Sequence, residues 1–138
     1  MEIFKMALKQ KEIIIESGRD KGKKFLITEM PAYKIDDWAM RVLLALAGAG
    51  IDVAEAQDGL IGLARVAFQA LGKIPSEVSL PLLNELLDCV QIIPNGTTIP
   101  RPLDLELNDI EDFQNLWRFR KEVFSLHADF LLHGDGLS

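Results

Sequence analysis

The feature that most constrains the fold is a run at residues 38–47 that is apolar almost all the way round a helix. Arg41 is the only charged residue in it. A helix without a polar face has to be enclosed by its own protein or by a partner, because free exposure would leave a large apolar surface in water. We therefore expect a chain that is built for contact with other chains more than for chemistry.

The length and composition indicate one folded domain. The chain has 138 residues, which is long enough to bury a hydrophobic core. Hydrophobic residues make up 49% and charged residues 26% of the chain, as in a soluble globular protein. The mean hydropathy of +0.13 is high for such a protein. It indicates a large core, an oligomer interface or a surface that binds another chain's apolar side chains.

The charge balance argues against two classes of partner. The chain carries 21 acidic and 15 basic residues, a formal net charge of -6, which repels nucleic acid phosphates and anionic membranes. No secretion signal is recognisable at the N-terminus, and the longest apolar run is shorter than the roughly 20 residues that span a bilayer. The single cysteine, Cys89, cannot form an internal disulfide. We expect a cytoplasmic protein without nucleic acid or membrane partners.

A β-hairpin is predicted at the N-terminal end, over residues 12–30. Two short apolar stretches, at 12–16 and 23–28, flank a glycine-containing turn. The turn is basic and carries Arg19, Lys21, Lys23 and Lys24. These cations are expected to be solvated, and the alternative is an electrostatic contact with an acidic partner.

The remainder of the chain is predicted to be largely helical. Helices are expected near residues 36–47, 60–71, 79–89 and 108–132, with a proline-rich irregular crossing at 94–108. Asp36 and Asp37 are placed to cap the first helix, and Asn108 followed by Glu111 has the pattern of a capping box for the last. The predicted fold is α+β, mainly α: a single domain, 1–138, in which the N-terminal β-hairpin packs on a bundle of about four helices over 36–132.

No residue constellation indicates catalysis, a cofactor or a metal. His127, Asp129 and His133 point in different directions around a helix and cannot converge on one ion. Cys89 lies in an apolar segment, where a thiol is buried and unreactive. An enzyme that uses a cleft lined by Asp36, Asp37 and His127 has no motif behind it.

The cluster at residues 117–121 combines aromatic and basic side chains. Such a cluster could stack nucleic acid bases. Trp117, however, is predicted to lie on the apolar stripe of the last helix, while Arg118 and Lys121 share the opposite side. The pattern therefore favours an ordinary amphipathic helix.

Two parts of the chain resemble a known family. The segments 25–32, 38–41 and 43–47, and the closing segment 116–130, are similar to tail assembly chaperones of tailed bacteriophages. The resemblance implies a small cytoplasmic protein, made in the infected or lysogenic bacterial host, that coats the tape measure protein and helps recruit tail tube subunits. It also implies a protein that is not an enzyme and has no catalytic residues to assign.

An excess of apolar surface suits such a chaperone, because the apolar stripe of a helical client has to be covered. It also suits a homo-oligomer. The alternative is a structural tail component, similar to a terminator or connector, that stays in the virion. The candidates for contact with a client or a second copy are Trp38, Met40, Leu43, Leu44, Phe113, Trp117 and Phe124.

Overall fold

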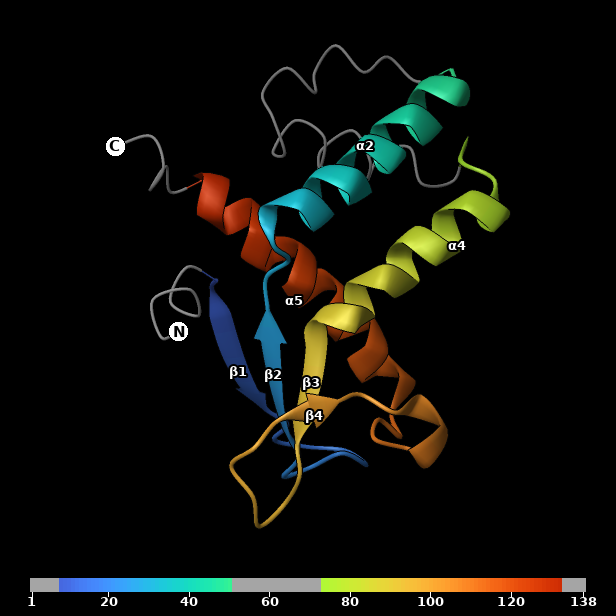
Figure 1. Ribbon diagram of the computed structural model, residues 1–138. Coiled ribbons are helices and arrows are strands. Elements are labelled where there is room, and N and C mark those ends of the chain that lie inside the picture. Colours follow the sequence, from blue (N-terminus) through green and yellow to red (C-terminus); the bar gives the residue numbers. More distant parts are fainter. Residues whose placement is uncertain (1–7, 51–72, 133–138) are drawn as a thin grey trace. The chain divides into compact units, whose positions relative to one another are not determined.

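The computed structural model describes residues 8–50 and 73–132. Within these residues the chain forms a four-stranded antiparallel sheet, three α-helices and two short 3-10 helices (Figure 1). In chain order the elements are β1 (Gln10–Ile14), β2 (Lys24–Thr28), α2 (Ala32–Gly48), α4 (Ser76–Glu85), η3 (Leu86–Cys89), β3 (Val90–Ile93), β4 (Arg101–Pro102), η4 (Leu105–Leu107) and α5 (Phe113–Leu132). Among the helices described, none has the length and apolar character needed to cross a membrane.

Residue contacts divide the chain into two compact units. The first, here named the sheet unit, comprises residues 1–29 and 84–126. The second, the helical unit, comprises residues 30–83 and 127–138. The sheet and the first part of α5 therefore belong to the sheet unit, and α2 with most of α4 belongs to the helical unit.

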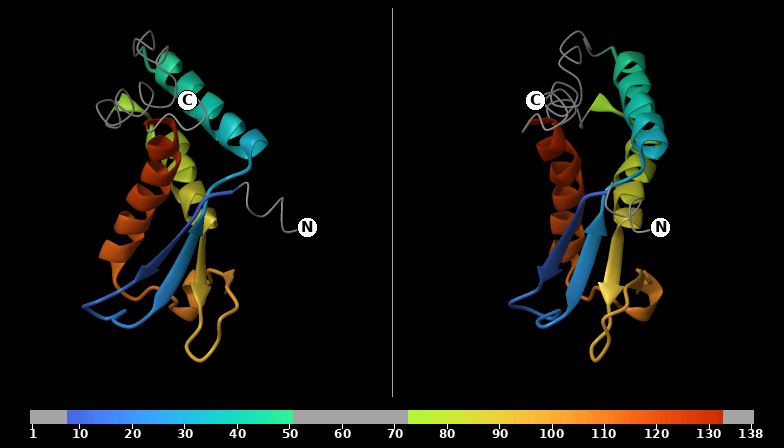
Figure 2. Two further views of the ribbon diagram at one scale, coloured as in Figure 1. Left: turned by 90° about the vertical axis from the view of Figure 1, so that its left-hand side faces the viewer. Right: turned by 60° about the vertical axis from the view of Figure 1, so that its left-hand side comes forward.

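In the sheet unit, one face of the sheet is buried. The strands lie in the order β1-β2-β3-β4, and the register places Phe25 opposite Ile92 and Ile27 opposite Val90. These four side chains are buried, as alternate residues on one face of a strand pair should be. The Phe25 ring contacts Phe119 of α5, with centroids 4.7 Å apart, and Figure 2 shows the first part of α5 beside the sheet. α5 thus covers the apolar face of the sheet.

The core of the helical unit follows one stripe of α2. Trp38, Val42 and Leu46 are buried and recur every four residues, so they share one side of the helix. The Trp38 indole N–H donates to the carbonyl oxygen of Leu82 in α4, at 2.9 Å. The backbone N–H of Met30 donates to Nε2 of the buried His127, also at 2.9 Å. These two bonds connect segments that are distant in the sequence.

The predicted bundle of about four helices is wrong. β1 and β2 occupy the predicted hairpin, but they belong to a sheet of four strands, so the described residues form a mixed α+β fold and not a helical bundle with a hairpin on it. α4 ends at Glu85, inside the predicted helix 79–89, and the chain becomes β3 from Val90 onwards. The strand forms there because β2 offers an edge on which it can pair. The predicted helix at 60–71 lies outside the described residues.

Two predicted helix starts also differ from the structure. α2 begins directly after Pro31, so Asp36 and Asp37 lie within the helix and do not cap it, and Asp37 pairs with Arg41 at 2.8 Å. Asn108 adopts a left-handed conformation, φ 58°, and ends η4. α5 starts at Phe113. The backbone amides at its start therefore need another cap.

Candidate partner-binding surface

The residues that lead into α5 are fixed by a side chain from the β1–β2 turn, while Asp112 caps the helix locally by accepting the backbone N–H of Gln114 at 3.2 Å. Asp20 has 0% of its side chain exposed. Its carboxylate accepts hydrogen bonds from the backbone N–H groups of Glu111, at 2.8 Å, and Asp112, at 3.0 Å. It also accepts one from the side-chain amide of Asn115, at 2.8 Å. The residues around the first turn of α5 are thus fixed by a carboxylate that is distant in the sequence. A negative charge is favourable there, because the N–H groups at a helix start carry a partial positive charge.

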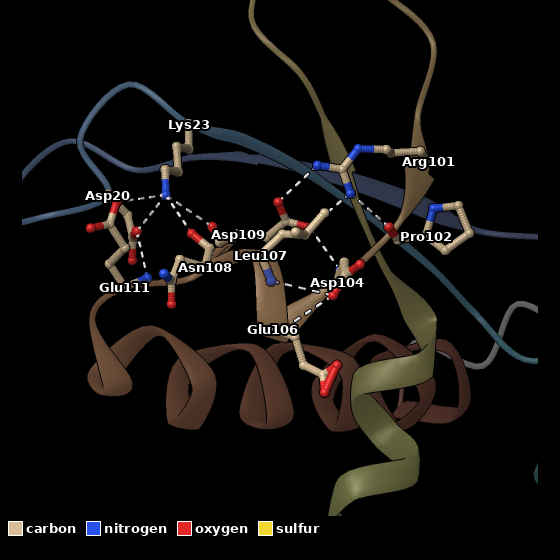
Figure 3. Close-up of polar contacts among 10 residues, drawn as sticks. All are labelled: Asp20, Lys23, Arg101, Pro102, Asp104, Glu106, Leu107, Asn108, Asp109 and Glu111. Atoms are coloured by element: carbon tan, nitrogen blue, oxygen red, sulfur yellow. Dashed lines mark hydrogen bonds and ion pairs between the residues drawn. The ribbon is translucent and has the colours of Figure 1, made fainter.

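The turn that carries Asp20 is itself held in place by Lys23. Its ammonium group, Nζ, contacts Asp20 Oδ1 at 3.0 Å and Glu111 Oε2 at 3.2 Å. It also donates to the carbonyl oxygens of Asn108 and Asp109 (Figure 3). The prediction that Lys23 is solvated with the other cations of the turn is therefore wrong. The structure uses this side chain to join the turn to residues 108–111.

A second ion pair fixes the segment that precedes α5. The guanidinium group of Arg101 donates two hydrogen bonds to the two carboxylate oxygens of Asp109, both at 2.8 Å. Asp109 also accepts the backbone N–H of Asp104, at 2.7 Å, and Asp104 in turn caps η4 (Figure 3). We name Asp20, Lys23, Arg101 and Asp109 the polar clamp. Two-point pairing of this kind fixes orientation as well as distance.

The polar clamp is charged at neutral pH. Burial alone would raise the pKa of Asp20, but its hydrogen bonds with Glu111, Asn115, Lys23 and Asp112 lower it below the ordinary 3.8. Burial likewise would lower the pKa of Lys23, but Asp20 and Glu111 raise it above 10.5. The Arg101 hydrogen bond lowers the pKa of Asp109. These shifts stabilise fixed charges, whereas a general acid or base needs a pKa close to the working pH.

Large apolar side chains protrude from the backbone that the clamp fixes. Phe113 is 62% and Trp117 is 67% exposed. Their rings meet edge to face, with centroids 5.8 Å apart and an interplanar angle of 79°. Phe124, which is half-buried, lies within about 40° of both around the helix at about 100° per residue. We name Phe113, Trp117 and Phe124 the aromatic stripe.

The other candidate contact residues lie in the helical unit, on α2. Trp38 is buried, Leu43 is half-buried, and Met40 and Leu44 are exposed. Tyr33, which the sequence analysis missed, is also exposed and shares a side of α2 with Met40 and Leu44. The spacing of residues 33, 40 and 44 could have shown this, because it places all three within about 40° around a helix. The predicted set therefore falls on two surfaces, one in each unit.

Two of the residues considered for chemistry are described and buried. His127 is buried on α5 and accepts a backbone hydrogen bond from Met30, and the thiol of Cys89 is buried. The side chain of Asp129 and the whole of His133 lie outside the described residues. Over residues 8–50 and 73–132, no group of three or more His, Cys, Asp and Glu side chains could hold a metal ion.

No family model, no curated protein and no solved structure matches the chain. A function therefore has to be inferred from the surfaces described above. Of these, the aromatic stripe combines an ordered backbone with exposed aromatic rings. Trp and Tyr with Arg dominate the binding energy of protein interfaces, and ordered presentation lowers the entropic cost of binding. The aromatic stripe is accordingly the best candidate for a protein-binding site.

Proposed function

We propose that the protein is a non-enzymatic phage tail assembly chaperone that binds the tape measure protein and helps recruit tail tube subunits in the bacterial cytoplasm. The observation that carries this proposal is the exposed pair of Phe113 and Trp117 on a backbone fixed by the polar clamp. The resemblance of segments 25–32, 38–41, 43–47 and 116–130 to that family supports it.

The surface chemistry suits a helical client. A long helical protein that awaits its tube exposes an apolar stripe, and a chaperone has to cover this stripe reversibly. Exposed rings on a rigid helix supply apolar contact area at low cost in side-chain entropy. The net charge of -6 disfavours nucleic acid as an alternative partner.

The test is co-expression of the full chain with the tape measure protein of the same gene cluster, followed by affinity capture and size-exclusion chromatography. The expected result is a complex that contains both proteins. An unrelated coiled-coil protein of similar length is the control bait and should not be captured. Failure to capture either the tape measure protein or the tube protein would contradict the proposal.

The same exposed surfaces would suit a structural subunit that stays in the finished tail. Mass spectrometry of purified virions separates the two functions. A chaperone is expected in lysates and missing from virions. Detection of the chain in virions in stoichiometric amounts would favour the structural function.

A further inference from the structure

We propose that the aromatic stripe, with Arg120 and Lys121 beside it, binds one α-helical segment of the partner, whose apolar residues are flanked by carboxylates. This inference rests on the proposed function. It adds to it the surface that makes the contact and the chemistry of the client segment that fits it.

The aromatic stripe offers an exposed apolar surface to a partner. Phe113 and Trp117 are exposed although each is large enough to stabilise a core. The stripe continues through Phe124, so it follows one side of α5 from residue 113 to 124, about 16 Å at 1.5 Å per residue. A side of a helix with this length matches a second helix packed along it, with apolar residues at spacings of three and four.

Two basic side chains lie beside the aromatic stripe. At about 100° per residue, Arg120 and Lys121 fall on opposite sides of the line through Trp117 and Phe124, so Lys121 lies beside the stripe and not opposite Trp117 as predicted. Lys121 is exposed. The acid nearby, Glu122, already pairs with Arg118 at 3.7 Å and with Lys11 at 2.8 Å.

Arg120 contributes positive charge beside the stripe. Its guanidinium group donates from Nη2 to the side-chain oxygen of Asn84, at 2.7 Å. Its Nε is covered from solvent and has no acceptor among the described residues. That nitrogen is out of reach of a client, so Arg120 would act on the client through the charge of its guanidinium group, which pairs well with carboxylates. Carboxylates on both sides of the client's apolar residues would therefore complement Arg120 and Lys121.

Charge also selects against a nucleic acid in the same place. Aromatic and basic side chains together could stack bases. The stripe, however, begins beside Glu111 and Asp112, and half of the Glu111 side chain is exposed. The carboxylates at this end would repel phosphates, and a helix with its acids opposite residues 120–121 would avoid them.

The experiment compares four variants of the full chain for affinity to the tape measure protein. Trp117→Ala should weaken binding by about tenfold or more, and Lys121→Glu about threefold, with the second effect fading at high salt. Lys21→Glu makes the same charge change on the β1–β2 turn, and Ile99→Ala removes an exposed apolar side chain elsewhere in the sheet unit. Both controls should bind within about twofold of the wild type.

A second measurement locates the contact. The chain has two tryptophans, and Trp38 is 5% exposed, so quenching by acrylamide reports mainly on Trp117. Binding of the tape measure protein should protect Trp117 from acrylamide. Binding that leaves the quenching unchanged would place the contact elsewhere and overturn the inference.

The outcomes separate the inference from the proposed function. Capture by the wild type and equally by Trp117→Ala and Lys121→Glu would overturn the inference and leave the function standing. No capture by the wild type would remove both. Protection of Trp117 by self-association alone, or by a single-stranded oligonucleotide, would identify a different occupant and overturn the inference.

Discussion

The two tryptophans show how one residue type can serve two purposes in this chain. Trp38 on α2 is 5% exposed, and Trp117 on α5 is 67% exposed. Both occur in helical segments with apolar residues three or four positions away. The sequence therefore makes both of them candidates for partner contact, and only the structure separates them.

The difference lies in what each indole ring meets. Trp38 donates its N–H to the carbonyl of Leu82 in α4, and a carbonyl oxygen can accept a second hydrogen bond besides its helical one. Burial is favourable because the polar atom of the ring is satisfied. Trp117 meets the Phe113 ring edge to face and remains two-thirds exposed. A backbone acceptor at the right place thus distinguishes the core tryptophan from the surface one.

The largest expected effect is that of Trp38→Ala. Removal of a buried indole should lower the free energy of unfolding by about 3–5 kcal/mol. Urea denaturation followed by far-UV circular dichroism measures this loss. Trp38→Phe keeps most of the ring and removes the N–H donor, so it should cost about 1 kcal/mol. A loss below about 1 kcal/mol for Trp38→Ala would mean that Trp38 contributes no more to stability than an exposed residue such as Trp117.

Asp20→Ala should have the next largest effect. It leaves the backbone N–H groups of Glu111 and Asp112 without their acceptor and takes from the Lys23 ammonium group its buried partner, which should cost about 3 kcal/mol in urea denaturation. Asp112→Ala is the matched comparison, because it removes only the local N-cap of α5, the hydrogen bond from the backbone N–H of Gln114. This control should cost about 1 kcal/mol or less. Equal losses for the two variants would contradict the stabilising role that we assign to Asp20 in the polar clamp.

Lowering the pH should decrease the stability of the sheet unit. The pKa values of Asp20 and Asp109 are lowered by folding, so their contribution to stability is complete well above the ordinary 3.8. It is lost as the pH falls below 3.8 through the folded-state pKa values. Urea midpoints measured from neutral pH down to about pH 2 should therefore decline on the acid side. Asp20→Asn should show a shallower decline, and an unchanged slope would contradict this origin.

The smallest expected effect on stability is that of Trp117→Ala. An exposed side chain outside the core should change the free energy of unfolding by about 0.5 kcal/mol or less. The same denaturation measurement tests this. A loss as large as that expected for Trp38→Ala would show that the aromatic stripe is part of a core and not a binding surface.

The local pattern is sufficient to predict part of the fold. The hairpin follows from two apolar stretches around a glycine-containing turn, and β1 and β2 lie there. β3 cannot be predicted in the same way, because residues 86–93 form a mainly apolar run that periodicity does not divide between helix and strand. Residues 90–93 form a strand because they pair with the edge of β2, and a local stretch of sequence carries no information about that edge.

The candidate site is predictable only in its residue types. Phe113 and Trp117 are contact candidates from the sequence, but the same pattern assigns them to the apolar stripe that would face the core. The buried side of α5 is instead formed by Phe119 and Val123. The contact of Asp20 with the residues before α5 cannot be predicted from the sequence, because Asp20 lies 91 residues before Glu111 and capping patterns involve residues only a few positions apart.

The link between Asp20 and Glu111 has a consequence for the order of events during synthesis. An isolated two-stranded hairpin is marginally stable in water, and β2 also needs β3 as its second neighbour. The hairpin leaves the ribosome before the residues that complete it, since Asp20 and Lys23 find their partners only once residues 108–115 have been made. The sheet unit therefore matures late in translation, and its unpaired strand edge has to be kept from other nascent chains until then.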